Sequence, residues 1–495
     1  MPLTARRRRL VEVLAVGFAG SGLMAWWAWL DEEPGHPEQL HGIQIGPWLL
    51  GLLGLVLLLT AWLRSASLKS RRGLTAACWS TPMLVTRPML SQDSWAYAAQ
   101  GWLLAHGHNP YLVAQGQAGP MAAHVDWHWS GTTAVYPPGS LWIQAAMTAL
   151  AANHPYWSIL AMRIPAVVAM VVIAVAVARM ARMTGADPQL ALWLIVTNPL
   201  VLLNIIGGAH NDGLQVAIAL VALWSGWSLA RARRPWLGLL AGGALVGLAG
   251  TIKQPGVLAG LGLVALVHRQ VVTDGGRDTW RALVGRTLTG AVAAIAVFTG
   301  VSAIGGLGLG WLNDTAGTPA SVTSDSLIAM TVQVIGWTGI PVARLVGPAT
   351  TISLVLTAAA IIWCWARWGP VPGYRAAAGS RPLALQAAAL AAFAICGASL
   401  QPWYLIGALA VLSLTPLTRR LTAGLVVAGV LGSGLCFLQW FSSPFLALPV
   451  AILTWLVVWL PARGHQWWES VAAAASGDPM RAGERVEAGG ASGLG

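Results

Sequence analysis

Residues 6–30 read RRRRLVEVLAVGFAGSGLMAWWAWL, four arginines followed by an apolar run from Leu10 to Leu30. A secretory signal peptide has the same order of basic and apolar parts. This run, however, reaches the length of about 20 residues that crosses a bilayer, and no small-residue cleavage site precedes Asp31. We therefore predict that it is an uncleaved first membrane helix.

The composition of the whole chain agrees with a membrane protein. Of its 495 residues, 56% are hydrophobic and 9% are charged, whereas soluble domains are about 45–50% apolar and about 25% charged. The net charge of +12 would suggest a nucleic-acid partner in a soluble protein. Here the basic residues lie in short clusters between apolar stretches, which the positive-inside rule explains. We therefore expect membrane lipids as surroundings and no nucleic acid as a partner.

The apolar stretches predict an all-α polytopic membrane protein with about 14 transmembrane helices. The predicted spans are 10–30, 47–64, 74–90, 156–180, 189–206, 212–230, 236–251, 255–269, 287–304, 341–366, 382–399, 403–418, 421–440 and 444–461.

The basic clusters predict the orientation of these spans. With this set of spans, every cluster falls on the same side of the membrane, which is then the cytoplasmic side. Both termini are therefore predicted to be cytoplasmic, in a multi-pass protein of the cell membrane. The clusters are Arg6 to Arg9, Arg64 to Arg72, Arg179 and Arg182, Arg231 to Arg234, Arg269 to Arg286, Arg367 to Arg381, Arg419 and Arg420, and Arg463.

One apolar stretch, 140–152, would reverse every later cluster if it crossed the membrane, so we interpret it as a helix on the outer surface. The loop 91–155 then becomes one large external element. The predicted organisation is a two-helix segment (1–73), a core with the external loop (74–304), C-terminal transmembrane helices (305–463) and a disordered cytoplasmic tail (464–495). Because the external loops are long and the cytoplasmic ones short and basic, we expect the active site outside.

Cysteine and histidine patterns give little support to a metal or a disulfide. Cys78, Cys364, Cys396 and Cys436 all lie in apolar stretches without metal-ligand spacing, and we interpret them as small buried hydrophobes. His124, Asp126 and His128 alternate with a period of two, which would align them only in an extended strand. No zinc-protease spacing is present. We therefore expect no cofactor and no resident metal, with a divalent metal at these three residues as the alternative.

Asp93 is the candidate catalytic residue. It follows the third predicted span and opens a predicted helix from Ser94 to Leu104. A carboxylate at this position can be the helix N-cap, because it accepts backbone N–H bonds. It can equally be a general base at the membrane edge, where water, a lipid head group and a polar substrate meet. The local sequence leaves both interpretations open.

A second group of candidates lies at other external helix ends. His210, Asn211 and Asp212 follow two glycines, and a helix N-terminus beside them would suit an anionic head group. Asn211 and Asp212 are also good helix caps. Lys253 lies at a break between two short helices, where an ionisable residue near the bilayer is a functional candidate or a snorkelling side chain.

Four further residues fit a phosphate or a sugar by their chemistry. Arg163, near the outer end of the fourth span, is a phosphate contact or an interfacial anchor. Gln401, Trp403 and Tyr404 offer an amide and two aromatic rings at an external helix junction, which suits a sugar or an aromatic belt equally.

Together these residues offer one candidate base and several cationic or neutral donors. They indicate group transfer from a phosphorylated donor, with an acid that deprotonates an acceptor hydroxyl and a cation that stabilises the leaving phosphate. No phosphate-binding loop, dinucleotide-binding glycine pattern or nucleophile elbow is present. This favours a lipid-phosphate donor on the outside over a cytoplasmic nucleotide.

Several longer motifs, in this order, resemble the polyprenol-phosphomannose-dependent mannosyltransferases of the GT-C superfamily of membrane glycosyltransferases. The similarity runs from about Leu49 to about Leu460. The motifs are QDSWAYAAQG (92–101), HNPY (108–111), YPPGSLW (136–142), NPLVLLNIIGGAHND (198–212), TIKQP (251–255) and QPWYL (401–405).

The resemblance implies the GT-C architecture and an inverting transfer of mannose from polyprenyl-phosphate mannose to a lipid-linked mannan or oligosaccharide, with an α-1,6 linkage expected. The acid of the first large external loop is the general base in that superfamily, and Asp93 matches it. The donor or substrate contacts that we then expect are Tyr97, Gln100, Tyr136, Arg163, His210, Asn211, Asp212, Lys253, Gln401, Trp403 and Tyr404.

Two departures from the family pattern concern the acceptor and the sugar. Gln92 stands where a basic residue is more usual, and the segment from Trp129 to Thr133 lacks an expected basic–amide pair. A GT-C transferase for arabinose or glucose therefore stays open. So do a transporter or flippase for a lipid-linked sugar and a non-catalytic scaffold. The sequence shows no related halves with broken helices at the midplane, which many transporters have.

Overall fold

The computed structural model describes residues 3–30, 45–68, 71–312, 326–373, 381–439 and 452. Within these ranges the secondary structure is helical and contains no strand. The predicted all-α class is therefore confirmed for this part of the chain. The predicted last span, 444–461, and the predicted tail, 464–495, lie outside the described residues.

Nine helical segments of the described part are long and apolar enough to cross a membrane, and a tenth qualifies if one bent pair is counted as a single span. The nine segments are built from α1 (Leu3–Leu30), α2 (Ile45–Ser65), α7 (Pro155–Ala161) with α8 (Arg163–Thr184), α11 (Asp212–Arg231), α12 (Pro235–Ile252), η6 (Gln254–Leu258) with α13 (Ala259–Thr273), α14 (Trp280–Ala303) with η7 (Ile304–Gly306), α17 (Val342–Trp368) and α20 (Arg419–Gln439).

The bent pair consists of α9 (Pro188–Ile195) and a second piece made of α10 (Pro199–Val201) and η5 (Leu202–Gly207), with a 49° bend between them. Pro199 starts the second piece and has no backbone N–H to continue the first. The last part, η5, is a π-helix, a widened turn that is frequent at functional sites. It ends directly before the loop that carries His210.

The predicted single helix over 74–90 is wrong. The chain forms α3 (Arg72–Ser80) and then the 3₁₀ turn η2 (Thr81–Val85), with Pro82 in the first turn of η2. A proline in a helix interior removes a hydrogen bond and clashes with the preceding turn. The nine-residue α3 is much too short to cross a bilayer.

Two C-terminal segments are also shorter than predicted. They are α18 (Pro382–Cys396) in place of 382–399, and η8 (Pro402–Leu405) with α19 (Ile406–Leu412) in place of 403–418. A further short apolar helix, α16 (Leu327–Gly336), lies between the predicted spans 287–304 and 341–366.

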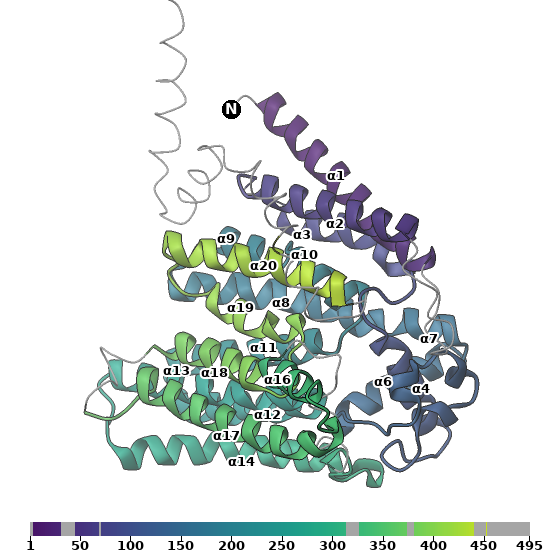
Figure 1. Cartoon of the computed structure of the whole chain (residues 1–495). Helices are drawn as coiled ribbons and strands as arrows, with labels where there is room; N and C mark the ends of the chain where they lie inside the picture. Colours follow the sequence, from purple (N-terminus) through teal and green to yellow (C-terminus); the bar gives the residue numbers. More distant parts are fainter. Residues whose placement is uncertain are drawn as a thin grey trace, which may run out of the picture.

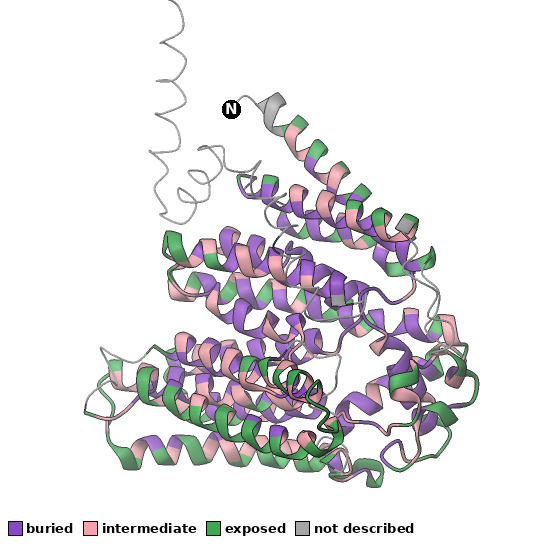
Figure 2. Ribbon diagram, in the orientation of Figure 1, coloured by how far each residue is buried: buried purple, intermediate pink, exposed green. Residues whose placement is uncertain are grey.

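The helices pack side by side, with α1 against α2, α8 against α11, and α12 against both α11 and α14 (Figure 1). Figure 2 shows that α14 and α17 are largely exposed. Their exposed side chains are large and apolar, including Leu288, Val292 and Ile295 on one face of α14. A helix face of this kind is suited to lipid. The candidate spans therefore support a multi-pass membrane protein.

Three helices lie together at one end of the bundle, namely α4 (Asp93–Ala105), α6 (Pro138–Leu150) and α7 (Figure 1). The 13-residue α6 packs against α4 and is too short to cross a bilayer, as predicted for 140–152. The short elements η3 (Gln115–Gln117), η4 (Gly119–His124) and α5 (Trp127–Ser130) join α4 to α6. This end of the bundle carries the candidate site.

Candidate active site

Asp93 is the first residue of α4 rather than its N-cap, which is Gln92. Its backbone N–H donates to the Ser91 hydroxyl at 3.1 Å. Its carboxylate accepts from side chains: Oδ2 lies 3.2 Å from the Tyr97 hydroxyl and 3.3 Å from the Tyr136 hydroxyl. The capping interpretation of Asp93 is therefore wrong. The carboxylate still lies in the first turn of α4, where the helix dipole favours negative charge.

The two tyrosines reach Asp93 from different elements. Tyr97 lies one turn further along α4, and Tyr136 comes from the segment before α6. Their rings meet edge to face, with centroids 5.3 Å apart. Burial, followed by neighbouring groups that include Asp93, raises the pKa of both hydroxyls well above the ordinary value. Both therefore stay protonated and act as hydrogen-bond donors to the carboxylate.

His210 approaches the same oxygen from the loop between η5 and α11. Its Nδ1 atom lies 3.3 Å from Asp93 Oδ2, and its side chain is fully buried. The ring of Trp403 in η8 stacks on it, with centroids 4.2 Å apart and planes inclined by 24°. The sequence predicts a His210 that projects toward a docking site for a head group. The structure corrects this, because the imidazole is enclosed behind the carboxylate.

Asn211 and Asp212 also turn their side chains toward other residues of the site. Asn211 occupies the N-cap position of α11 but makes no side-chain cap bond. Its Oδ1 atom lies 3.3 Å from the Tyr97 hydroxyl, and its Nδ2 donates to Ser140 Oγ at 3.1 Å. Asp212 Oδ2 accepts from Lys253 Nζ at 2.7 Å. The loop 207–212 therefore contributes three consecutive side chains to one cluster.

Lys253 lies in the break between α12 and η6, in an extended backbone conformation, and Pro255 lies in the first turn of η6. Its Nζ atom lies 4.3 Å from the ring centroid of Tyr404 and 6.0 Å from that of Tyr136. Tyr136 thus contacts the acid through its hydroxyl and faces the ammonium group with its ring. It joins Asp93 and Lys253 into one site.

The neighbouring groups in this cluster favour the ionised forms of Asp93 and Lys253. Burial alone would raise the pKa of the Asp93 carboxyl, but His210, Lys253 and Ser91 outweigh it and bring the pKa well below its ordinary value. Burial alone would lower the pKa of Lys253, but Asp212 and its other neighbours raise it. The Asp93 side chain is 21% exposed, whereas those of Lys253 and Asp212 are 9% and 8% exposed. Asp93 is thus the most accessible charged group of the cluster.

Three predicted contacts lie apart from these interactions. Arg163 is buried, and its guanidinium donates to the carbonyls of Arg87, Ile159, Ile206 and Gly207. It therefore braces the loop that precedes His210. Gln100, further along α4, is buried, and its Oε1 has no hydrogen-bond partner among the described residues. Gln401 is half-buried at the start of η8, where its carbonyl accepts the N–H of Tyr404.

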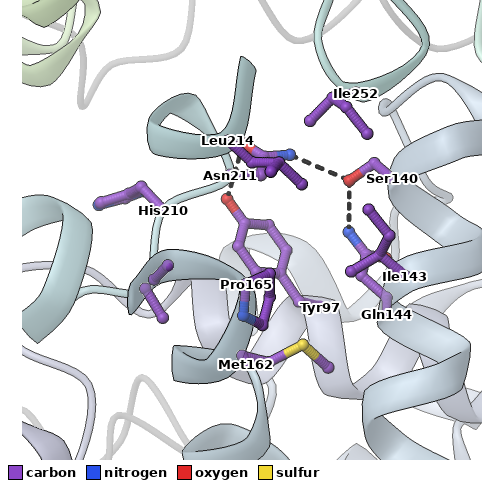
Figure 3. A pocket seen from close by; sticks show the side chains of 12 residues that line it. Tyr97, Ser140, Ile143, Gln144, Met162, Pro165, His210, Asn211, Leu214 and Ile252 are labelled. Atoms are coloured by element: carbon purple, nitrogen blue, oxygen red, sulfur yellow. Dashed lines mark hydrogen bonds between the residues drawn. The ribbon is translucent and has the colours of Figure 1, made fainter. Parts of the chain in front are cut away.

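A small cavity lies next to the cluster, and Tyr97, His210 and Asn211 are among the residues that line it (Figure 3). Its volume of about 30 Å³ holds one or two water molecules but no sugar. Ser140 and Gln144 of α6 line it, and Gln144 Nε2 donates to Ser140 Oγ at 3.1 Å. Neither residue is among the site residues predicted from the sequence. Ser140 belongs to the YPPGSLW motif, and Gln144 follows one helical turn later on the same face.

The alternative metal residues do not come together. His124 stacks on Trp95, with ring centroids 4.5 Å apart, while Asp126 caps α5 and contacts His128. Over the part of the chain that the structure describes, no group of three His, Cys, Asp or Glu side chains is placed to hold a metal ion. The four cysteines all lie in the described ranges, and no disulfide joins them there.

Comparison with known proteins identifies relatives. Residues 11–269 match a family described as "Alpha-(1->6)-mannopyranosyltransferase, N-terminal domain". The chain is 29% identical over 303 residues to alpha-(1->6)-mannopyranosyltransferase A of Corynebacterium glutamicum, covering 57% of this chain and 60% of that protein. It is 28% identical over 309 residues to the protein of the same name from Mycobacterium tuberculosis, covering 61% and 56%.

A third relative, from Mycolicibacterium smegmatis, is named "Probable alpha-(1->6)-mannopyranosyltransferase" and is 27% identical over 454 residues, covering 82% of this chain and 78% of that protein. The chain thus spans less than two thirds of the first two relatives and more of the third. No solved structure matches the chain. The matched residues 11–269 include Asp93, Tyr136, His210 and Lys253, whereas Trp403 and Tyr404 lie beyond them.

Proposed function

The chain belongs to the alpha-(1->6)-mannopyranosyltransferase family, and we propose that it transfers mannose from polyprenyl-phosphate mannose to a lipid-linked mannan or glycolipid, forming an α-1,6 bond. The observation that carries the proposal is the pairing of an accessible carboxylate, Asp93, with a buried cation, Lys253, across Tyr136. A glycosyl transfer from a phosphate needs both groups at one place.

In the proposed reaction, Asp93 is the general base. Its carboxylate takes the proton of an acceptor hydroxyl, and the hydroxyl oxygen forms a bond to the anomeric carbon of the mannose. The bond between that carbon and the phosphate oxygen breaks, and the polyprenyl phosphate leaves with the electron pair. The attack inverts the anomeric centre, so an α-linked product requires a donor in which mannose is β-linked to phosphate.

Lys253 is proposed to stabilise the charge that develops on the leaving phosphate. Its ammonium group is held by Asp212 at 2.7 Å and lies over the Tyr404 ring. In these low-dielectric surroundings a fixed cation acts strongly on a developing anion, and it needs no reorganisation during the reaction. With Lys253 in this role the transfer requires no cofactor.

We further propose a GT-C architecture in which the site faces the outer side of the cell membrane and both termini are cytoplasmic. The predicted external segments support this orientation. Residues from 91–155, from 207–212 and from 401–404 contact one another in a single cluster together with Lys253. They therefore share one end of the bundle, opposite to the basic clusters if alternate helices cross the bilayer.

The test is transfer by the full-length protein in membrane vesicles. Radiolabelled polyprenyl-phosphate mannose is supplied with a lipid-linked mannan acceptor, and the arabinose and glucose forms of the donor are supplied in parallel. We expect label in the acceptor from the mannose donor, and release of that label by an α-1,6-specific mannosidase. Transfer from the arabinose or glucose donor alone would contradict the proposed sugar. Label that crosses the vesicle membrane without transfer would indicate a transporter instead.

A further inference from the structure

The position of His210 carries an inference that rests on the proposed function and deepens it. We propose that His210 is a positioning residue for Asp93. Its imidazole holds Oδ2 of the carboxylate from the buried side, and it leaves Oδ1 for the acceptor hydroxyl. In this role His210 acts through the base and makes no contact with the donor phosphate.

Burial separates this role from phosphate binding. The His210 side chain is fully buried, whereas that of Asp93 is 21% exposed. A substrate that enters the site therefore meets the carboxylate before it meets the imidazole. Trp403 covers one face of the ring, and Gly208 lies against its Nε2 edge, where a Cβ would come within 3.0 Å of Nε2. The imidazole is thus enclosed on one face by Trp403 and bordered at its Nε2 edge by Gly208.

The surroundings of the two ring nitrogens indicate where the imidazole carries its proton. Nε2 is buried and has no hydrogen-bond partner among the described residues. Nδ1 faces the carboxylate at 3.3 Å. A proton on Nδ1 gives the carboxylate an N–H to accept, whereas a lone pair on Nδ1 would face the lone pairs of the carboxylate oxygen. The proton is therefore placed on Nδ1, toward Asp93.

The contact at 3.3 Å is not yet a directional hydrogen bond, because no donor geometry is satisfied at Nδ1. Catalytic hydrogen bonds are often long without substrate and tighten when it binds. Ring stacking on Trp403 and a backbone bond from His210 N–H to the Asn204 carbonyl at 3.2 Å keep the imidazole in line for this. The imidazole is thus already oriented toward the Asp93 carboxylate before the acceptor binds.

The other contacts of the carboxylate explain why one oxygen is held. Oδ2 receives Tyr97, Tyr136 and His210, at 3.2, 3.3 and 3.3 Å, and none of these three contacts reaches Oδ1. Two tyrosine hydroxyls and the edge of the imidazole thus converge on one oxygen of the carboxylate. Oδ1 is then the oxygen that takes the acceptor proton.

The experiment compares His210→Asn, His210→Gln and His210→Ala in the mannosyl-transfer assay. An asparagine amide can place an N–H near the position of Nδ1, whereas a glutamine amide reaches the position of Nε2. We expect His210→Ala and His210→Gln to lower kcat by about tenfold or more, the loss of one hydrogen bond to a charged group. The donor KM should change by less than about twofold, since KM reports donor binding when chemistry is slow. His210→Asn should recover most of kcat.

The pH profile gives a second readout that a purely structural role would not change. His210 is among the groups that keep the pKa of Asp93 low, together with Lys253 and Ser91, while Tyr97 and Tyr136 contact the same oxygen. His210→Ala and His210→Gln should therefore move the acidic limb of kcat to higher pH, and His210→Asn should move it less. The matched control is His106→Asn, which removes another imidazole stacked on a tryptophan, at 4.0 Å from Trp102 and outside the site.

The possible outcomes distinguish a positioning role of His210 from donor binding and from a structural role. A raised donor KM with unchanged kcat in His210→Ala would assign His210 to the donor and overturn the inference. Equal losses in all three variants, with lower thermal stability and no pH shift, would assign it a structural role and also overturn it. If His210→Ala does not fold, the comparison of asparagine with glutamine remains decisive. A wild-type protein without mannosyl transfer would instead contradict the proposed function itself.

Discussion

The ammonium group of Lys253 and the carboxylate of Asp212 form an ion pair of 2.7 Å in which both side chains are more than nine-tenths buried. Asp212 is the first residue of α11, and Lys253 follows the last residue of α12. The pair therefore closes the end of the α11–α12 hairpin next to Asp93. Neither partner can be removed without leaving a charge in a place from which water is excluded.

This pair predicts a stability effect. Lys253→Met or Asp212→Asn alone should destabilise the protein by about 3–5 kcal/mol, because the remaining charge is buried and unpaired. The double variant should recover part of the thermal stability in detergent but none of the transfer activity, since it still lacks the cation. If the double variant were less stable than either single variant, the unpaired buried charge would not be the main cause of the destabilisation. Arg8→Met, in an exposed pair with Glu12, is the control.

Asp93→Asn should lower mannosyl transfer by about 10²–10⁴-fold, the contribution of a general base. Expression and donor binding should remain, because the amide has the same shape as the carboxylate. Asp126→Asn is the matched control, since Asp126 caps α5 of the same region and contacts His128 there. Measurement uses radiolabelled polyprenyl-phosphate mannose in membranes. Transfer at the wild-type rate by Asp93→Asn would exclude the proposed base.

Tyr97→Phe and Tyr136→Phe each remove one hydroxyl from Asp93 Oδ2. A hydrogen bond to a charged group contributes about 1.5–3 kcal/mol, so each variant should lose about tenfold or more in kcat. The double variant should lose less than the product of the two effects, because both hydroxyls share one oxygen. A double-mutant cycle on kcat measures this coupling, and strict additivity would show that the two contacts act independently.

The pKa of Asp93 lies below its ordinary value of about 3.9, which fixes the direction of its pH dependence. The ionised carboxylate therefore adds stability above about pH 4, and this contribution is lost as the pH falls further, through the folded-state pKa. Wild-type transfer should not decline between about pH 8 and pH 5 through protonation of Asp93. Lys253→Met removes a positive charge that lowers the pKa of Asp93. The acidic limb of the pH–rate profile should therefore move to higher pH in this variant. An unchanged limb, measured on the residual activity, would contradict the electrostatic coupling.

Arg163→Lys should affect stability rather than donor binding. The guanidinium serves four backbone carbonyls, which a single ammonium group cannot reach together. We expect a lower midpoint of thermal unfolding and an unchanged donor KM in the folded fraction. An increase in donor KM of about tenfold without loss of stability would return Arg163 to the phosphate site, where the sequence alone allowed it.

Nine of the predicted spans coincide with helical segments of the described residues that are long and apolar enough to cross a membrane, because a bilayer demands a fixed length of apolar helix whatever the neighbours are. The same rule failed at 74–90, where Pro82 divides an apolar stretch into two short pieces, and at 403–418, where the helix ends at Leu412. Hydropathy averages over such interruptions. The count of about 14 therefore exceeded what the described residues show.

The motifs of the sequence determined the family and selected Asp93, His210, Asp212 and Lys253, since each lies at a helix end rich in polar residues. The sequence could not determine how these residues are used, because that depends on which atoms meet across helices far apart in the chain. Only the tertiary structure placed Trp403 on His210 and enclosed the imidazole behind the acid. It also showed that Asp93 is the accessible charge of the site and not a helix cap. Its Oδ2 atom accepts from two tyrosine hydroxyls and not from backbone N–H groups.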